Sequence, residues 1–328
     1  MTPVRIGIVS WNTAELLDAC LAALPEAAAG LDFDVVVMDN SSADDSVAVA
    51  RRHPGVTVID SAVNTGYARG MNQALLYVRE GWTPEVLIAL NPDTVPPPRS
   101  LTRLVEHLMA DPTVGLVVPQ LTNPDGTLQH SVYRFPSSVI TAIICTVPVS
   151  LQRGRLARRW WLEGRVAHNE ATDIDWAIGA VHALRVSALD GQTPYSERWF
   201  MYVEDMDTCW RLHQAGWRIR LEPDSKVLHV GNAAGKQAWG QGRNQRWWEA
   251  TYDWYRLRHG NAAVRRWAMV NTVGVTTMLD RAKLRRKILR GRARQGTLAE
   301  INELQTILPV HKTMVRQPAT SYVPPPNT

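Results

Sequence analysis

Short apolar segments alternate with helix-like segments through about the first 120 residues of this 328-residue chain. The apolar segments are rich in Val and Ile, whereas the segments between them carry Ala and Leu at helical spacing. Such alternation predicts an α/β fold with a mostly parallel central sheet and right-handed crossovers. The predicted strands are 4–9, 34–38, 56–59, 86–90 and 114–118, and the predicted helices are 13–29, 44–53, 68–80 and 99–110.

The pattern changes in the second part of the chain. An irregular stretch is followed by a strand-like segment at 181–186, a helix from Glu204 to Ala215, two short strands at 217–222 and 226–230, and helical sequence from about 243 to 307. We expect a main domain over 1–235, with halves of about 1–120 and 121–235, then a helical region over 236–310. The tail, 311–328, is rich in Pro and polar residues near its end and is expected to be disordered.

The composition predicts a folded cytoplasmic protein. Cys20, Cys145 and Cys209 are too widely spaced for a disulfide framework or a zinc site, which indicates a reducing compartment. The N-terminus enters a strand directly, without the basic and apolar regions of a signal peptide. No uncharged apolar run reaches ~18 residues, so we expect no membrane-spanning helix.

The net charge of +5 comes from one stretch near the C-terminus. Residues 281–294 contain eight Lys or Arg and no acid, which leaves 28 basic and 31 acidic residues elsewhere. This distribution argues against a nucleic-acid-binding body. The mixture of Trp, apolar and basic residues from Trp247 to Arg294 fits a packed helical appendage, an interfacial helix on an anionic membrane surface, or a homodimer interface.

The segment Asn91-Pro92-Asp93 follows the apolar run 86–90 directly. A carboxylate at the end of a buried strand lies on the rim of the sheet, where open α/β folds bind ligands. Asp93 can therefore bind Mg²⁺ or Mn²⁺ together with substrate phosphates. The alternative is a turn in which Asp93 caps the helix that begins near Ser100.

Three other loops carry polar residues after predicted strands. The first is Ser10-Trp11-Asn12-Thr13, and the second begins at Asp39, whose carboxylate can accept the ring N–H of a pyrimidine or simply form a turn. The third, Asn64 to Asn72, opens a helix whose free N–H groups and Arg69 can face a diphosphate. The Walker and dinucleotide-binding glycine patterns are absent, which disfavours ATPase and dehydrogenase functions.

Two further groups lie in the second half. The acidic cluster Phe200 to Asp207 opens a helix, so its carboxylates either stabilise the helix start or include a general base, with Asp205 the candidate. His229 ends a strand and is either a structural residue or a ligand. The run 231–242 after it resembles a mobile lid that ends in Arg243 and Arg246, which can clamp a diphosphate.

Taken in order, these motifs resemble the family 2 inverting glycosyltransferases with the GT-A fold, in the branch of bacterial rhamnosyltransferases of cell-wall and surface polysaccharides. The resemblance covers residues 4 to about 232. Two departures stand out: Asn91 replaces the first acid of the family's metal motif, and residues 191–195 replace a Gly-Gly-Phe segment. The matching parts are 9–12, 37–42, 64–72, 90–93, 175–180, 200–207 and 215–217.

The resemblance implies a role for each matching position. Asp205 would be the general base, with Glu204 assisting, and Asp93 with His229 would hold Mg²⁺ or Mn²⁺. Trp176, Gly179 and Ala180 would shape the acceptor site. The donor site would be formed by Ser10, Asn12, Asp39, Asn64, Gly66, Arg69, Asn72, Asn91 and Asp93.

The resemblance favours transfer of L-rhamnose from dTDP-rhamnose to a hydroxyl of a glycan or lipid-linked acceptor, by an enzyme that is cytoplasmic or peripheral on the inner face of the plasma membrane. A UDP-sugar-dependent transferase, for example of galactofuranose, glucose or N-acetylglucosamine, is an alternative. A non-catalytic nucleotide-sugar-binding protein is an alternative from another class. A sugar nucleotidyltransferase is disfavoured because its Gly-rich, Arg-containing N-terminal loop is absent.

Overall fold

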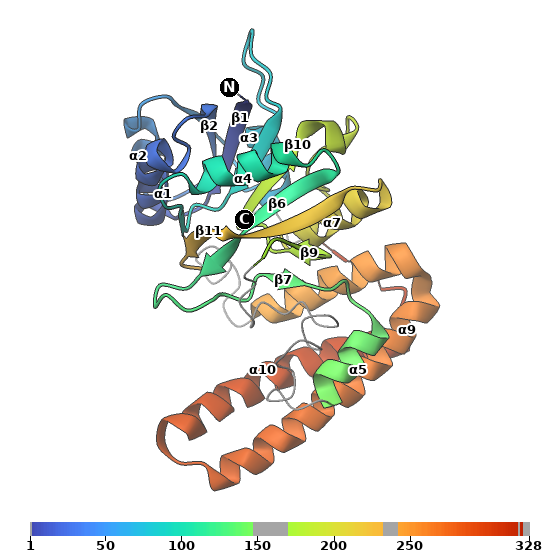
Figure 1. The fold of residues 1–328 in the computed structure, drawn as a ribbon. Coiled ribbons are helices and arrows are strands. Elements are labelled where there is room, and N and C mark those ends of the chain that lie inside the picture. Colours follow the sequence, from blue (N-terminus) through green and yellow to red (C-terminus); the bar gives the residue numbers. More distant parts are fainter. Residues whose placement is uncertain (1, 147–169, 232–241, 321, 324–328) are drawn as a thin grey trace. The chain divides into compact units, whose positions relative to one another are not determined.

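The computed structural model describes residues 2–146, 170–231, 242–320 and 322–323 (Figure 1). It divides the chain into two compact units. The first comprises Met1–Arg134, Leu162–Ala234 and Pro324–Thr328, and the second comprises Phe135–Trp161 and Gly235–Val323. The boundaries predicted from the sequence, at about 235 and 310, stay a prediction.

The first unit is built on a mixed sheet of nine strands among the described residues, in the order β3-β2-β1-β4-β10-β6-β11-β5, with β8 paired to β11. A separate pair joins β7 and β9. The strands are β1 (Pro3–Ser10), β2 (Asp32–Asp39), β3 (Val56–Asp60), β4 (Val86–Leu90), β5 (Thr94–Val95), β6 (Val114–Thr122), β7 (Val132–Tyr133), β8 (Thr172–Asp173), β9 (Trp176–Ala177), β10 (Val181–Arg185) and β11 (Arg218–His229).

The first four strands of the sheet run parallel, as the alternating pattern predicts. β1 lies between β2 and β4, with Ile6 opposite Val35 on one side and Ile88 on the other. β10 enters antiparallel between β4 and β6. The α/β prediction, with a mostly parallel sheet and a C-terminal helical region, is confirmed.

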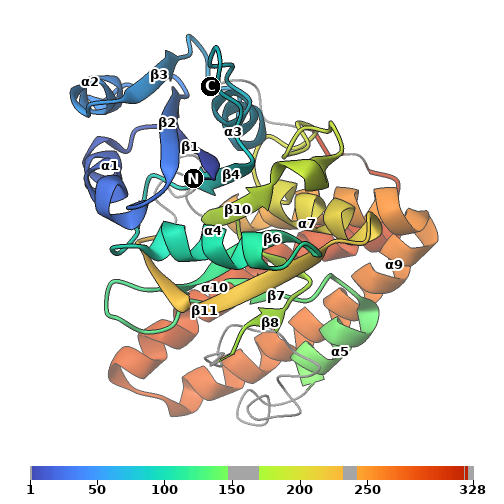
Figure 2. The ribbon, with the colours of Figure 1, turned by 45° about the horizontal axis from the view of Figure 1, so that its top comes forward.

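Helices cover both faces of this sheet (Figure 2). Ile6 and Ile8 face one side, where they share the apolar core with the buried residues of α1 and α4. Gly7 faces the other side, and a Cβ there would lie 2.8 Å from Leu75 of α3. The helices are α1 (Ala14–Ala27), α2 (Ser46–Arg52), α3 (Tyr67–Leu75), α4 (Ser100–Ala110) and α7 (Glu204–Gln214), with a 3-10 turn, η2, at Val186–Leu189.

β11 differs from the sequence-based expectation. The two short strands predicted at 217–222 and 226–230 form the single strand β11, which pairs in parallel with β6. Its register shifts between Glu222 and Lys226, where Pro223-Asp224-Ser225 interrupts the ladder. Pro cannot donate a ladder hydrogen bond, so the sequence looks like a turn although the strand continues beyond the irregularity.

The second unit is helical in its described part, with α5 (Ser138–Thr146), α9 (Arg243–Ile288) and α10 (Gly291–Arg316). α9 bends at Gly260, whose φ of 76° is not helical. Beyond the bend, Val275 and Leu279 pack against Ile301 and Leu304 of α10. α10 ends at Arg316, beyond the helical sequence expected to about residue 307.

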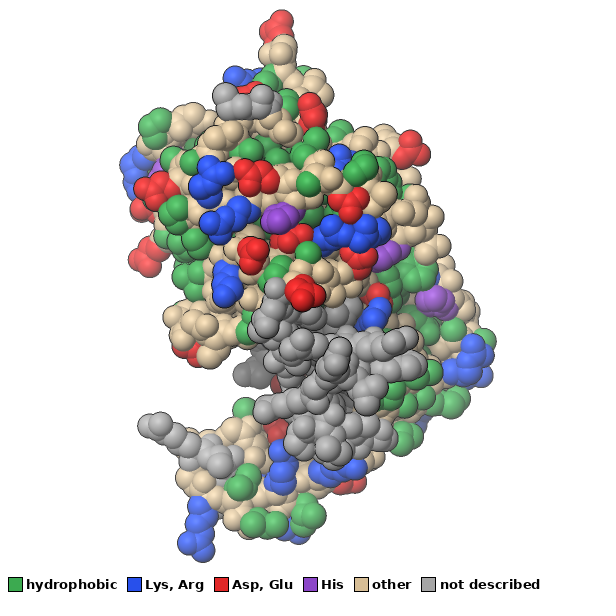
Figure 3. Space-filling view, viewed as in Figure 1, with side chains coloured by type: hydrophobic (Ala, Val, Ile, Leu, Met, Phe, Trp, Pro, Cys, Tyr) green, Lys and Arg blue, Asp and Glu red, His purple; other side chains and the backbone are tan. Residues whose placement is uncertain are grey.

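None of the helices in the described part of the chain combines the length and the apolar character that a membrane span requires. Figure 3 shows Lys, Arg, Asp and Glu side chains interspersed over the α4 face of the first unit. This mixture agrees with the near balance of charges outside residues 281–294.

Candidate active site

The carboxyl ends of three neighbouring strands bring the predicted donor loops to one edge of the sheet. β2, β1 and β4 lie side by side and end at Asp39, Ser10 and Leu90. Ser10 is buried, and its hydroxyl lies 2.9 Å from that of Thr13. In open α/β sheets this edge is where ligands bind.

The loops after β1 and β2 hold each other through polar groups. The N–H of Asn12 donates to the hydroxyl of Ser42 at 2.9 Å, and Asn12 Oδ1 accepts from the N–H of Ala43 at 2.7 Å. Asp39 is buried, and its Oδ1 accepts from the N–H of Ser42 at 2.8 Å. Burial raises the pKa of Asp39. Its Oδ2 has no hydrogen-bond partner among the described residues, so it can accept from a ligand.

Gly66 is required where the third loop passes the acidic cluster. Its φ is 84°, and a Cβ at this position would lie 2.4 Å from the carbonyl oxygen of Phe200. That carbonyl accepts from the N–H of Tyr67 at 2.7 Å. Asn64 Oδ1 accepts from the N–H of Gly66 at 3.0 Å. Asn40 Nδ2 donates to the carbonyl of Gly66 at 3.1 Å. The donor loop is therefore held directly against the segment that precedes Glu204 and Asp205.

The two remaining residues of this loop have different surroundings. Arg69, in the first turn of α3, is exposed and has no ion pair within the part of the chain that the structure describes. Asn72 is buried, and its amide exchanges hydrogen bonds of 2.8 and 3.0 Å with the backbone of Tyr195. It also donates to Glu197 at 3.1 Å. Asn72 thus braces the loop at 193–197 and does not present a free amide.

Asp93 lies beside His229, although the two residues are far apart in the sequence. β5 follows Asp93 and pairs with β11, which places His229 opposite Thr94. Oδ1 of Asp93 is 3.3 Å from Nε2 of His229, and both side chains are buried. The alternative of a helix cap is not seen, since α4 begins at Ser100 after Arg99 and has no side-chain cap.

Gln129 fixes the orientation of the His229 ring. Its Oε1 lies 2.6 Å from Nδ1 of His229, and its Nε2 donates to Asn123 and to the carbonyl of His229 at 3.0 and 3.3 Å. Because an amide oxygen only accepts, Nδ1 carries a proton in this contact, and the ring turns Nε2 toward Asp93. Nε2 and the buried Oδ1 of Asn91 have no hydrogen-bond partner among the described residues.

A strained backbone presents the acidic pair at the start of α7. Tyr202 and Val203 have φ values of 73° and 75°, which non-glycine residues rarely adopt. Glu204 and Asp205 follow as the first residues of the helix. Backbone strain of this kind concentrates at functional sites, so it marks these two carboxylates as candidates for a functional role.

The two carboxylates are in environments that penalise charge. Burial raises the pKa of Asp205 to about 6, although hydrogen bonds from the N–H groups of Met206 and Gly179 lower it. Burial and the neighbouring Asp205 raise the pKa of Glu204 well above its usual range. Because the two carboxylates are neighbours, ionisation of one disfavours ionisation of the other.

The peptide segment Gly179-Ala180 is hydrogen-bonded both to the acidic pair Glu204-Asp205 and to the loop 91–93. The N–H of Gly179 donates to Oδ2 of Asp205 at 3.0 Å, and the carbonyl of Ala180 accepts from the N–H of Asn91 at 2.9 Å. The hydroxyl of Tyr67 donates to the carbonyl of Gly179 at 3.0 Å. Burial, Glu204, Asp205 and Asp93 raise the pKa of Tyr67 well above its usual range, so the hydroxyl stays protonated as a donor.

Trp176 is buried three positions before Gly179. It is 5% exposed and stacks on Tyr133 with ring centroids 4.7 Å apart. Its indole N–H donates to the carbonyl of Arg134 at 3.0 Å. The indole is therefore fixed in one orientation by its neighbours.

The predicted lid falls almost wholly on residues 232–241, which lie outside the described residues. Arg243 and Arg246 belong to the second unit. Arg243 donates to Asn244 at 3.2 Å, and Arg246 pairs with Glu249 at 3.4 Å. Whether these arginines reach a diphosphate stays a prediction.

The sequence analysis missed three residues of this region: Asn40, Tyr67 and Gln129. Asn40 and Tyr67 lie inside motifs that were recognised, and the position of Tyr67 after a helix-opening glycine is the signal that could have identified it. Gln129 had no such signal, because its role depends on a contact with His229, 100 positions further along the chain.

Solved structures resemble this fold. The mannosyltransferase PcManGT from Pyrobaculum calidifontis, in complex with GDP-Man and Mn²⁺, matches with a TM-score of 0.57 and 19% identity over 96% of this chain and 84% of that chain. GalNAc-T7 with UDP, GalNAc and Mn²⁺ matches with a TM-score of 0.52 and 15% identity over 78% of this chain and 50% of that chain. This likeness shows the GT-A fold.

Curated relatives include rhamnosyltransferases. An N-acetylglucosaminyl-diphospho-decaprenol L-rhamnosyltransferase of Mycobacterium tuberculosis is 26% identical over 309 residues, which cover 87% of this chain and 97% of the relative. The rhamnosyltransferase WbbL of Escherichia coli K12 is 22% identical over 201 residues, or 60% of this chain and 72% of the relative. The sequence pattern of glycosyl transferase family 2 matches residues 6–171, about half of the chain. The chain therefore belongs to glycosyl transferase family 2 and is an enzyme of the hexosyltransferase class.

Proposed function

We propose that this enzyme transfers L-rhamnose from dTDP-rhamnose to a hydroxyl of a lipid-linked glycan, with inversion at the anomeric carbon. The observation that carries the proposal is the environment of Asp205, which is buried and hydrogen-bonded to a backbone N–H. A buried carboxylate with a pKa of about 6, fixed by the N–H of Gly179, has the properties of a general base. The names of the two rhamnosyltransferase relatives support the choice of sugar, and that of the mycobacterial relative supports a diphospholipid acceptor.

The donor nucleotide would lie along the ends of β1, β2 and β4. Asp39 supports this, because its free Oδ2 can accept the ring N–H of a pyrimidine. Ser10 and Asn12 would flank the base, while Asn64, Gly66 and Arg69 would face the diphosphate. The guanidinium of Arg69 is exposed and has no ion pair among the described residues, so it is suited to a phosphate. Asn72 would support this site indirectly through the backbone of Tyr195.

Asp93 and His229 would hold Mn²⁺ or Mg²⁺, with Asn91 adding an amide oxygen. The unpartnered Nε2 of His229 and Oδ1 of Asn91 support this set. So does Gln129, which orients the imidazole as outer groups do at metal sites. No cluster of three or more His, Cys, Asp or Glu side chains that could hold a metal occurs in the described ranges, so the diphosphate would complete the coordination. When bound, the metal would neutralise charge on the leaving diphosphate.

The reaction would use Asp205 as the proton acceptor. The acceptor hydroxyl would give its proton to Asp205 while its oxygen forms a bond to the anomeric carbon. On the opposite face, the bond from that carbon to the diphosphate oxygen would break, and the nucleoside diphosphate would leave. Protonated Glu204 would limit the negative charge beside the base. Trp176, Gly179 and Ala180 would shape the acceptor side.

We also propose that residues 281–294 attract an anionic membrane surface. Leu284 and Ile288 are 61% and 75% exposed on α9, next to the exposed Lys283 and Lys287. Exposed apolar residues with flanking cations favour the interface of an anionic bilayer. Flotation with anionic vesicles is expected to carry the protein upward at low salt, and absence of binding at low salt would refute this part of the proposal.

A panel of nucleotide sugars tests the donor. dTDP-rhamnose with Mn²⁺ or Mg²⁺ is expected to raise the melting temperature more than UDP-galactofuranose, UDP-glucose or UDP-N-acetylglucosamine. Release of dTDP on addition of acceptor would distinguish an enzyme from a binding protein. A larger shift with a UDP-sugar would replace the proposed donor and leave the proposed chemistry in place.

A further inference from the structure

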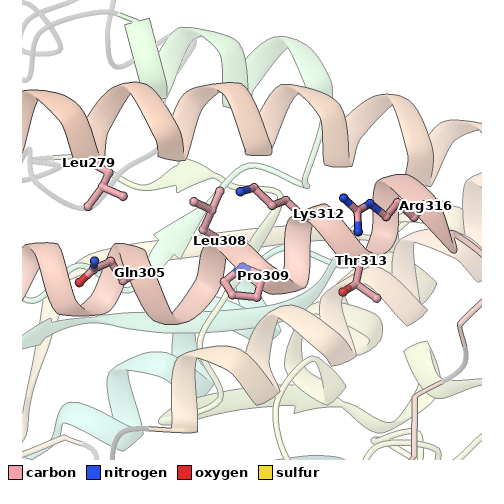
Figure 4. Close-up of a pocket in the computed structure, with 7 residues that line it drawn as sticks. All are labelled: Leu279, Gln305, Leu308, Pro309, Lys312, Thr313 and Arg316. Carbon is pink, nitrogen blue, oxygen red and sulfur yellow. The ribbon is translucent and has the colours of Figure 1, made fainter.

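A groove of about 450 Å³ lies between α9 and α10 of the helical unit (Figure 4). Its size falls within the range of small-molecule sites, roughly 300–1,000 Å³. Leu279 of α9 and Leu308 of α10 enter it from the two helices. The remaining lining residues are Gln305, Pro309, Lys312, Thr313 and Arg316, all on α10.

The lining of the groove includes two cations and no acid. Lys312 and Arg316 are four residues apart on α10, so their side chains lie on the same face of the helix. Both are exposed, and neither has an ion pair among the residues that the structure describes. No acidic residue is among those that line the groove. Like charges at this spacing destabilise a helix, so an anion between them would relieve the repulsion.

Pro309 lines the groove together with two leucines, and it also removes one helical hydrogen bond. Pro309 has no N–H, so the carbonyl of Gln305 loses its helical partner in this turn. Leu279 is 6% exposed and Leu308 is half-buried, and both pack in the contact between the two helices. The groove thus combines an apolar surface with two cations.

We propose that this groove binds one molecule of an amphiphile with a phosphate headgroup, a phosphorylated lipid. The phosphate would lie between Lys312 and Arg316, with the Thr313 hydroxyl as a further donor, and the chain would lie along Leu279, Leu308 and Pro309. Two cations beside aliphatic side chains match both parts of such a ligand. This site is distinct from the donor site and does not depend on the proposed rhamnosyl transfer.

Calorimetric titration of the full chain tests the proposal without any sugar donor. The probes are dodecyl phosphate below its critical micelle concentration, dodecyl maltoside with the same chain, and inorganic phosphate. Dodecyl phosphate is expected to bind at least about tenfold more tightly than either of the others, because only it uses both parts of the groove. Equal affinity for the maltoside or for inorganic phosphate would overturn the proposal.

Three variants locate the binding. Lys312→Ala with Arg316→Ala, and separately Leu308→Glu, are expected to weaken dodecyl phosphate binding by about tenfold or more. The control, Arg265→Ala with Arg266→Ala, removes two exposed cations of α9 outside the groove and is expected to change the Kd by less than about twofold. An unchanged Kd in the Lys312/Arg316 variant, or an equal loss in the control, would overturn the proposal. Because all four cations are exposed, both double variants are expected to melt as the wild type does.

Discussion

The N–H of Gly179 donates a hydrogen bond of 3.0 Å to Oδ2 of Asp205. The adjacent carbonyl of Ala180 accepts from the N–H of Asn91, so one turn of backbone links the two acidic motifs. A shift of this turn would therefore move both the candidate base, Asp205, and the candidate metal-binding loop at 91–93. Through these two hydrogen bonds a glycine and an alanine, whose side chains carry no polar group, would contribute to the candidate site.

Tyr67→Phe is expected to lower kcat by about tenfold and to leave the KM for the donor within about twofold. The variant loses the hydrogen bond to the carbonyl of Gly179 and loosens the turn, at a typical cost of about 1 kcal/mol. A weaker bond from Gly179 to Asp205 also raises the pKa of the carboxyl. The acid limb of the pH–rate profile should therefore move to higher pH. An unchanged limb with a raised donor KM would show that Tyr67 acts in donor binding instead.

Gly66→Ala is expected to destabilise the protein by more than about 3 kcal/mol, because it combines a left-handed φ with a collision against the Phe200 carbonyl. Gly55→Ala is the matched control. Its φ is 79°, but no atom lies within 4 Å of the added Cβ, so only the backbone cost of about 1–2 kcal/mol applies. Thermal unfolding compares the two. Equal losses would show that the contact with Phe200 does not constrain the loop.

Much of the fold could be predicted from the sequence because the relevant signals are local. Val and Ile runs such as 86–90 are buried strands, and the helix from Glu204 ends at Gln214, next to the predicted end. β11 was read as two strands because Pro223 mimics a turn, whereas pairing with β6 carries the strand past the irregularity. That pairing joins distant parts of the chain and leaves no local pattern.

Gln129→Leu is expected to raise the Mn²⁺ concentration for half-maximal activity by about 10–100-fold, the usual effect of losing an outer partner of a metal ligand. Without Oε1, the His229 ring is free to change tautomer and to turn away from Asp93. Gln73→Leu makes the same chemical change at an exposed position of α3 and should leave the metal dependence unchanged. An unchanged metal dependence in Gln129→Leu would remove His229 from the proposed metal site.

Glu204→Gln is expected to stabilise the protein as the pH rises. Because burial raises the pKa of Glu204, its stabilising contribution is present below the unfolded pKa of about 4.3 and is lost toward the folded pKa. The amide does not titrate. The melting temperature of the variant minus that of the wild type should thus be larger at pH 8 than at pH 5. Each kcal/mol of added unfolding free energy corresponds to about 2–4 °C. A difference that is constant with pH would mean that Glu204 does not titrate in this range.

The candidate site was only partly visible in the sequence. Asp39, Asp93 and Asp205 could be found because carboxylates at strand ends and helix starts are informative alone. The bracing role of Asn72 depends on a contact with Tyr195 that only the folded chain creates. The same is true of Tyr67, whose hydroxyl meets a carbonyl 112 positions away.

The most direct test measures transfer and donor binding in Asp205→Asn. The amide cannot accept the proton of the acceptor hydroxyl, so the rate is expected to fall by about 10²–10⁴-fold while the Kd of the donor stays within about twofold. The wild type should lose activity as the pH falls through about 6, where Asp205 takes up its proton. Turnover above about a tenth of the wild-type rate in Asp205→Asn would contradict its role as the general base.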